Sequence, residues 1–84
     1  MTVRARLTET QQWLLEIIDR HRFVTETTLA AIMGRGWHNA FWSCVRRGWV
    51  ECLGYIDDGR HYVRVFLLTR AGRRLLVGQR IELP

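Results

Sequence analysis

Apolar residues recur at helical spacing in three stretches of the first half of the chain, and each stretch predicts an amphipathic helix. The first helix is expected to begin after Thr8 and to end near His21. Thr8 and Gln11 fit a capping box, in which the threonine hydroxyl and the glutamine side chain each bond a backbone amide of the other residue. The residues expected on the buried face are Trp13, Leu14, Ile17 and Ile18.

A short apolar step at residues 23–24 follows this helix and is long enough only for a stub of strand. Thr25 then fits the N-cap of a second helix, and Gly34 ends that helix where a left-handed residue is needed. The inner stripe of this helix is expected to consist of Leu29, Ile32 and Met33. The turn at residues 34–36 leads into a third helical stretch, and two helices joined by a short turn with glycine form a helix-turn-helix pattern.

The third stretch, residues 35–47, is the part of the chain around which we expect the rest to be organised. At about 100° per residue, its apolar positions fall within one arc of roughly 140°. This core-facing stripe consists of Trp37, Ala40, Phe41, Cys44 and Val45. The opposite face is expected to carry His38, Asn39, Trp42, Ser43 and Arg46, with Arg35 at the start and Arg47 at the edge. We therefore interpret residues 35–47 as a recognition helix.

The apolar pattern changes from helical to alternating after Gly48. Residues 49–56 and 62–68 are rich in β-forming residues, and the loop between them, residues 57–61, contains an Asp-Gly turn signal. Two such runs joined by a short loop predict a β-hairpin.

A last short helix is predicted after the hairpin. Thr69 can cap it, Gly72 weakens it, and it is expected to end at Val77. Residues 78–84 are expected to trail off. The whole pattern predicts an α+β fold of three helices, a β-hairpin and a short C-terminal helix.

The length and charge of the chain narrow its role. Eighty-four residues without a repeat or linker indicate one domain over residues 1–84, with its core at about 7–77. All thirteen cationic residues are arginine, and with eight acidic residues the formal net charge is +5. A small basic domain is drawn to polyanions, most often nucleic acid and less often a membrane surface or an acidic protein.

The two cysteines, Cys44 and Cys52, are too few for a disulfide framework, and we expect both to be reduced packing residues. No apolar run approaches the roughly 18 residues that span a bilayer, and the first residues lack the hydrophobic segment of a signal peptide. We therefore expect a soluble, cytoplasmic protein without a membrane partner.

An enzyme is not expected. The three histidines, His21, His38 and His61, fall on a helix end, a helix face and a turn, without metal-ligand spacing. The chain shows no Ser/His/Asp order and no glycine-rich loop after a strand. We therefore expect no catalytic residues, no metal and no cofactor.

The order of elements resembles the winged helix-turn-helix family, over roughly residues 7–77. Residues 45–51, VRRGWVE, look like the recognition-helix exit of MarR-like bacterial regulators, in which two polar residues, a glycine, an apolar pair and an acid lead into the wing. Residues 66–73, FLLTRAGR, are similar to their wing exit, an aromatic residue followed by Leu-Thr and a glycine. We expect the chain to lack the long terminal helices through which MarR-like proteins dimerise, and we expect no effector-binding domain. The resemblance thus implies a minimal winged helix regulator of phage, plasmid or archaeal type.

The expected DNA contacts follow from this arrangement. In the major groove, Asn39 could pair with adenine and Arg46 with guanine. Arg60 and His61 at the hairpin tip are the natural wing contacts, and Arg64 on the outward face of the second strand is a further phosphate contact. The candidate DNA-binding residues are Arg35, His38, Asn39, Trp42, Ser43, Arg46, Arg47, Arg60, His61, Arg64, Thr25 and Thr27.

Each group of candidates also has a plain structural interpretation. The exposed face of residues 35–47 could be an ordinary solvated helix face. Thr25 and Thr27 could hold a phosphate at a helix start, but capping explains Thr25 equally well. Asp57 and Asp58 could neutralise the hairpin tip and repel phosphate.

Two functions therefore remain open from the sequence. The first is a sequence-specific regulator of transcription that binds double-stranded DNA, as a homodimer on a palindromic operator. The second is a protein-binding winged helix, either a phage-encoded inhibitor such as an anti-defence protein or an assembly subunit. In that case Trp42, Trp37 or Tyr55 would anchor the protein partner, because large aromatic residues are typical interface anchors.

Overall fold

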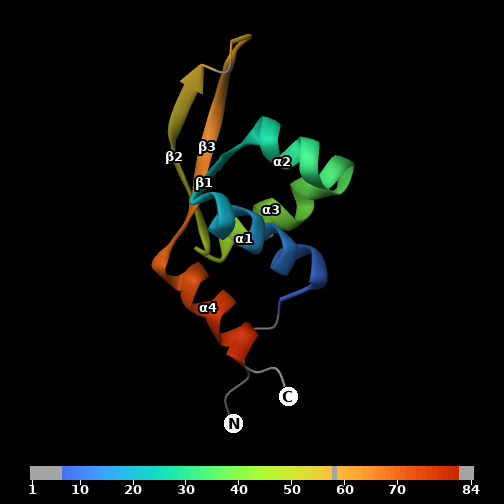
Figure 1. The fold of residues 1–84 in the computed structure, drawn as a ribbon, viewed down its shortest axis with the longest axis vertical. Coiled ribbons are helices and arrows are strands. Elements are labelled where there is room, and N and C mark those ends of the chain that lie inside the picture. Colours follow the sequence, from blue (N-terminus) through green and yellow to red (C-terminus); the bar gives the residue numbers. More distant parts are fainter. Residues whose placement is uncertain (1–6, 58, 82–84) are drawn as a thin grey trace.

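The computed structural model describes residues 7–57 and 59–81, and it shows a helix-turn-helix followed by a β-hairpin and a last helix (Figure 1). The described elements are α1 (Glu9–His21), β1 (Phe23–Thr25), α2 (Glu26–Met33), a 3-10 turn (Gly34–Gly36), α3 (Trp37–Arg46), β2 (Val50–Asp57), β3 (Tyr62–Leu68) and α4 (Arg70–Ile81). The α+β class and the order of the elements are as predicted. The β2–β3 hairpin projects away from the helices, and α4 lies toward the opposite end of the molecule (Figure 1).

The three strands of the described chain form one antiparallel sheet in the order β1-β3-β2. The predicted stub of strand is confirmed, since Val24 of β1 pairs with Phe66 of β3. On the other side of β3, Val50 pairs with Leu68, and a bulge interrupts the β2 register between Cys52 and Gly54. The sheet therefore ties the chain between α1 and α2 to the hairpin.

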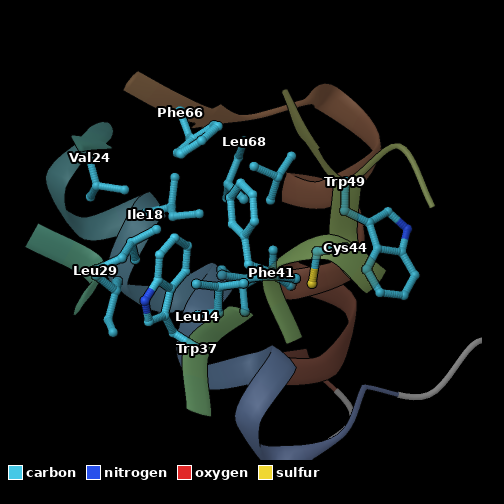
Figure 2. Close-up of a cluster of buried hydrophobic side chains, with 14 residues drawn as sticks. Leu14, Ile18, Val24, Leu29, Trp37, Phe41, Cys44, Trp49, Phe66 and Leu68 are labelled. Atoms are coloured by element: carbon cyan, nitrogen blue, oxygen red, sulfur yellow. The ribbon is translucent and has the colours of Figure 1, made fainter. Parts of the chain in front are cut away.

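Phe41 of α3 lies at the centre of the buried cluster (Figure 2). Its ring centroid is 5.2 Å from that of Trp37 and 4.3 Å from that of Phe66, and its side chain is fully buried. Aromatic pairs at such distances add to the free energy gained by burying apolar area. The predicted core stripe of α3 is thus confirmed, and Phe41 joins it to the sheet.

The capping box at the start of α1 is confirmed. The Thr8 hydroxyl accepts from the Gln11 amide at 3.1 Å, and the Gln11 side chain accepts from the Thr8 amide at 3.0 Å. The Gln11 carboxamide also faces the interior, where its nitrogen donates to Ser43 of α3 at 2.7 Å. One residue thereby caps α1 and fixes it against α3.

The predicted inner faces of α1 and α2 need correction. Trp13 is 47% exposed, and Leu15 is buried in its place. The buried stripe of α1 is centred on positions 11, 14, 15 and 18, so Trp13 lies on nearly the opposite side of the helix. In α2, Leu29 is buried and Met33 packs against the core, but Ile32 is exposed. The α2 helix is short and presents only a narrow face to the core.

A compact junction joins the end of α3 to the start of α4. The Thr69 amide donates to the Trp49 carbonyl at 3.0 Å, and the Thr69 hydroxyl donates to the Gly48 carbonyl at 2.5 Å. The same hydroxyl accepts from the Gly72 amide at 3.1 Å, as a cap of α4. The two segments that carried the family resemblance therefore meet here.

Gly72 is required by close packing. A Cβ atom at this position would lie 2.2 Å from the Trp49 carbonyl oxygen, a distance that real Cβ atoms do not adopt. The expectation that Gly72 only weakens the last helix missed this contact. The predicted end of α4 at Val77 is also wrong, since the helix continues to Ile81, and Leu76 is fully buried.

We predict that Gly72→Ala lowers the free energy of unfolding by about 1 to 3 kcal/mol, because the added methyl group must displace the Trp49 backbone. Gly78→Ala in the same helix is the matched control, since nothing lies within 4 Å of the position that its new Cβ would take. The control should raise the free energy of unfolding by up to about 1 kcal/mol through helix propensity. Urea unfolding followed by circular dichroism measures both. Equal stabilisation by the two substitutions would contradict the close contact.

Candidate nucleic-acid interface

The exposed face of α3 is formed as the sequence predicted, except at Ser43. Gly34 adopts a φ of 72° and ends α2, and the 3-10 turn with exposed Arg35 leads directly into α3. His38, Asn39 and Arg46 are exposed on α3. Asn39 and Arg46 lie opposite the buried stripe, and His38 lies at its edge. The His38 ring lies against that of Trp37, with 4.1 Å between centroids. Amide, imidazole and guanidinium groups thus share one solvent-facing surface.

Ser43 does not belong to this surface, which corrects its predicted placement. Its hydroxyl accepts from the Gln11 side chain at 2.7 Å and donates to the Ala40 carbonyl at 2.8 Å. Ser43 lies about 120° from the centre of the buried stripe, at the border that packs against α1. Both hydrogen-bonding functions of the hydroxyl are satisfied inside the protein, so Ser43 supports α3 rather than facing a groove.

Trp42 lies on the exposed face but is not isolated there. Its side chain is 41% exposed, and its ring meets Phe41 edge-on at a centroid distance of 5.2 Å. The Arg64 guanidinium carbon lies 5.3 Å from the Trp42 ring centroid. This distance is within the range of a cation–π contact. Trp42 therefore connects the core of α3 to the wing strand β3.

Arg64 points toward the helices, not outward as predicted. Its Nε and Nη2 atoms both bond Oε1 of Glu26, the first residue of α2. The reason lies in the two-residue period of β3, which puts Arg64 on the same face as buried Phe66. The alternating pattern could not show this, because Val63 and Val65 on the other face are buried as well.

Capping accounts for Thr25 at the start of α2. Its Oγ1 accepts from the Thr28 amide at 3.1 Å and lies 3.1 Å from the Thr28 hydroxyl. Thr27 is exposed in the same first turn. Of the two, Thr27 is the more exposed, and a phosphate contact there stays a prediction.

The hairpin tip carries the predicted wing residues. Arg60 and His61 are both exposed. The Gly59 amide donates to the Asp57 carboxylate at 2.8 Å, and Gly59 has a φ of 97°, which favours glycine. Asp57 therefore shapes the turn, whereas Asp58 lies outside the described residues. The β2–β3 hairpin projects past the helices, so its tip lies away from them (Figure 1).

Arg47 lies at the C-terminal end of α3. It is the C-cap residue, and its guanidinium carbon is 5.3 Å from the Trp49 ring centroid. Its side chain is exposed. Arg35 lies in the 3-10 turn just before α3. The exposed face of α3 therefore has an arginine at each end.

The two cysteines differ in environment. Cys44 is fully buried in the α3 stripe, and burial raises the pKa of its thiol from 9.0 to about 11. Cys52 is exposed on β2, with its Sγ 3.6 Å from the Gly54 carbonyl oxygen. The expectation of two packing residues is therefore correct for Cys44 and wrong for Cys52, which lies beside the bulge.

The part of the chain that the structure describes, residues 7–57 and 59–81, offers neither a metal-ligand cluster nor a membrane-spanning helix. No group of three or more His, Cys, Asp or Glu side chains lies close enough together there to hold a metal ion. Among the same residues, no helix has the length and apolar character needed to cross a membrane.

Comparison with known proteins identifies the fold. No protein-family model matches the chain, and no curated protein matches it. Among solved structures it is similar to the adhesin competence repressor AdcR from Streptococcus pyogenes, with a TM-score of 0.71 and 23% sequence identity. The match covers 90% of this chain and 57% of that one, so the chain spans little more than half of the repressor's length. The predicted winged helix fold is thereby confirmed.

We predict that a thiol-reactive reagent at neutral pH modifies only Cys52 rapidly in the folded protein. Cys44 is both inaccessible and held as the thiol, and the thiolate is the reactive form. Colour release by a disulfide reagent should reach one equivalent in buffer and two in denaturant, and Cys52→Ser should abolish the rapid phase. A rapid reaction that persists in this variant would contradict the burial of Cys44.

We also predict that Cys44 makes folding sensitive to alkaline pH. Because the pKa of the folded thiol is raised to about 11, the folded state holds its proton more tightly than the unfolded chain. Stability from this group is complete below about pH 9 and falls as the pH rises toward 11. Urea midpoints across this interval measure the decline, which Cys44→Ala should reduce. An unchanged pH dependence in that variant would contradict the assignment.

Proposed function

We propose that this winged helix is a regulator of transcription that binds double-stranded DNA through α3. The observation that carries the proposal is the two-sided character of α3, with a buried apolar stripe and an exposed face of amide, imidazole and guanidinium groups. A helix about 10 to 12 Å across fits the major groove of B-DNA. The similar solved structure is that of a repressor, which supports the same function for this chain.

The proposed roles divide between base reading and backbone contact. Asn39 reads adenine and Arg46 reads guanine, because their side chains can form paired hydrogen bonds with these bases. Arg35 and Arg47 at the two ends of α3 neutralise phosphates, which positions the helix without reading sequence. His38 and Trp42 line the groove between them, and Thr27 meets a phosphate at the start of α2.

The wing supplies a second point of contact. Arg60 and His61 are exposed at the hairpin tip, where they reach the backbone or the minor groove beside the site of α3. One such domain makes few contacts, so we propose that two copies act together on a palindromic site, which adds their binding energies. The protein would do so in the cytoplasm, with DNA as its main partner.

A protein-binding winged helix is not favoured. That alternative was motivated by a large aromatic residue on the exposed face of α3. Trp42 has a structural reason to be there, because it packs edge-on against Phe41 and under Arg64. Its exposure therefore needs no protein partner to explain it.

We predict that tryptophan fluorescence is quenched by a random-sequence duplex at low salt, and that this binding weakens steeply as salt rises. Trp42→Phe should remove most of the quenching. Trp13→Phe is the matched control, since Trp13 is comparably exposed on α1, away from the proposed interface. A flat titration at low salt would contradict DNA binding and turn attention to protein partners.

We further predict that Asn39→Ala and Arg60→Ala weaken DNA binding in different ways. With an operator found by selection, Asn39→Ala should cost about 1 to 3 kcal/mol and relax preference at one base position. Arg60→Ala should weaken operator and random duplex alike and lower the salt slope by about one. Equal losses on both duplexes for Asn39→Ala would remove that residue from base reading.

A further inference from the structure

A carboxylate, a guanidinium and an indole from three elements meet where the wing joins the helix-turn-helix. Glu26 begins α2, Trp42 lies on the exposed face of α3, and Arg64 comes from the middle of β3. Arg64 bonds Glu26 through two nitrogens, and its guanidinium carbon lies 5.3 Å from the Trp42 ring centroid. The Glu26 and Arg64 side chains are 25% and 32% exposed, so the group is partly open to solvent.

This ion pair lies next to the surface that the proposed function assigns to DNA. The Trp42 ring that Arg64 covers belongs to the same exposed face as Asn39 and Arg46. An arginine held over an aromatic ring beside a groove-reading helix is well suited to bind a phosphate, because its planar fork matches both carboxylate and phosphate oxygens. In this chain the fork is already filled by a carboxylate of the same molecule.

We propose that Glu26 is an internal substitute for a DNA phosphate, which masks a phosphate-binding site formed by Arg64 above Trp42. This inference rests on the proposed function. Glu26 holds Nε and Nη2 of Arg64, so a phosphate that binds this edge of the guanidinium must displace the carboxylate. Glu26 thereby keeps the affinity for DNA below the value that the protein would have if Arg64 were free to bind a phosphate.

The position of Glu26 explains why the carboxylate holds its place. As the first residue of α2, it lies near the positive end of the helix dipole, where a negative charge is stabilised. Partial burial reduces the screening of the ion pair by solvent and salt. A phosphate must therefore displace the Glu26 carboxylate, instead of binding a fully hydrated arginine.

The test compares salt-dependent binding of a random-sequence duplex by three full-length proteins: the wild type, Glu26→Gln and Glu51→Gln. Glu26→Gln removes the charge and leaves an oxygen that can still accept from Arg64. Glu51→Gln makes the same change of net charge on an exposed residue of β2. Glu51 pairs with Leu67, and therefore lies on the opposite face of the sheet from Arg64. Urea midpoints verify that the variants remain folded.

Glu26→Gln is expected to bind several-fold more tightly than the wild type at low salt. Its plot of log affinity against log salt should be steeper by about 0.9, the contribution of one further phosphate contact on B-DNA. Glu51→Gln should leave that slope unchanged. In the double variant Glu26→Gln/Arg64→Gln the slope should return to that of the wild type, because the released guanidinium is its source.

Two results would overturn the inference while leaving DNA binding intact. If Glu26→Gln and Glu51→Gln behave alike, Glu26 acts only through net charge. If Glu26→Gln binds DNA more weakly than the folded wild type, the ion pair positions the wing for binding instead of masking a site. Failure of the wild type itself to bind duplex at low salt would contradict the proposed function, and the inference with it.

Discussion

The contact between the end of α3 and the start of α4 is the constraint on which the rest of the structure depends. The Thr69 backbone and side chain bond the carbonyls of Trp49 and Gly48, and Gly72 lets α4 approach the Trp49 carbonyl. The Trp49 amide in turn donates to the Cys44 carbonyl at 3.0 Å. The last turn of α3, the start of β2 and the start of α4 are thereby held as one unit, which limits the angle between the helix and the hairpin.

The proposed interface is a consequence of that unit and of the aromatic core behind it. Phe41 packs between Trp37 and Phe66, so α3 cannot rotate about its axis without disrupting the contact with the sheet. Fixing α3 in this way turns Asn39 and Arg46 to solvent and leaves Ser43 against α1. Polar groups held on a rigid element can read base edges more selectively than groups on a loop, because less conformational entropy is lost on binding.

Local signals in the sequence were enough to predict the helices and strands. They could not predict contacts between residues that are distant in the chain. The capping box at Thr8, the turn at Gly34 and the change of period after Gly48 each act within a few residues, and each predicted an element correctly. The orientation of Arg64 depends on Glu26, which lies 38 positions earlier in the chain. The internal bond of Ser43 depends on Gln11, which lies 32 positions earlier. In β3 both faces are apolar, so alternation could not decide which one meets the helices.

The most direct test of the account is a map of the amide groups that respond when a duplex is added to isotopically labelled protein at low salt. We expect chemical-shift changes to concentrate on the exposed face of α3, on the first turn of α2 and on the hairpin residues around Arg60. The amides around Trp13 and along α4 should change little. Changes centred on the exposed face of α1 or on α4, with α3 unaffected, would contradict the assignment of α3 as the helix that meets DNA.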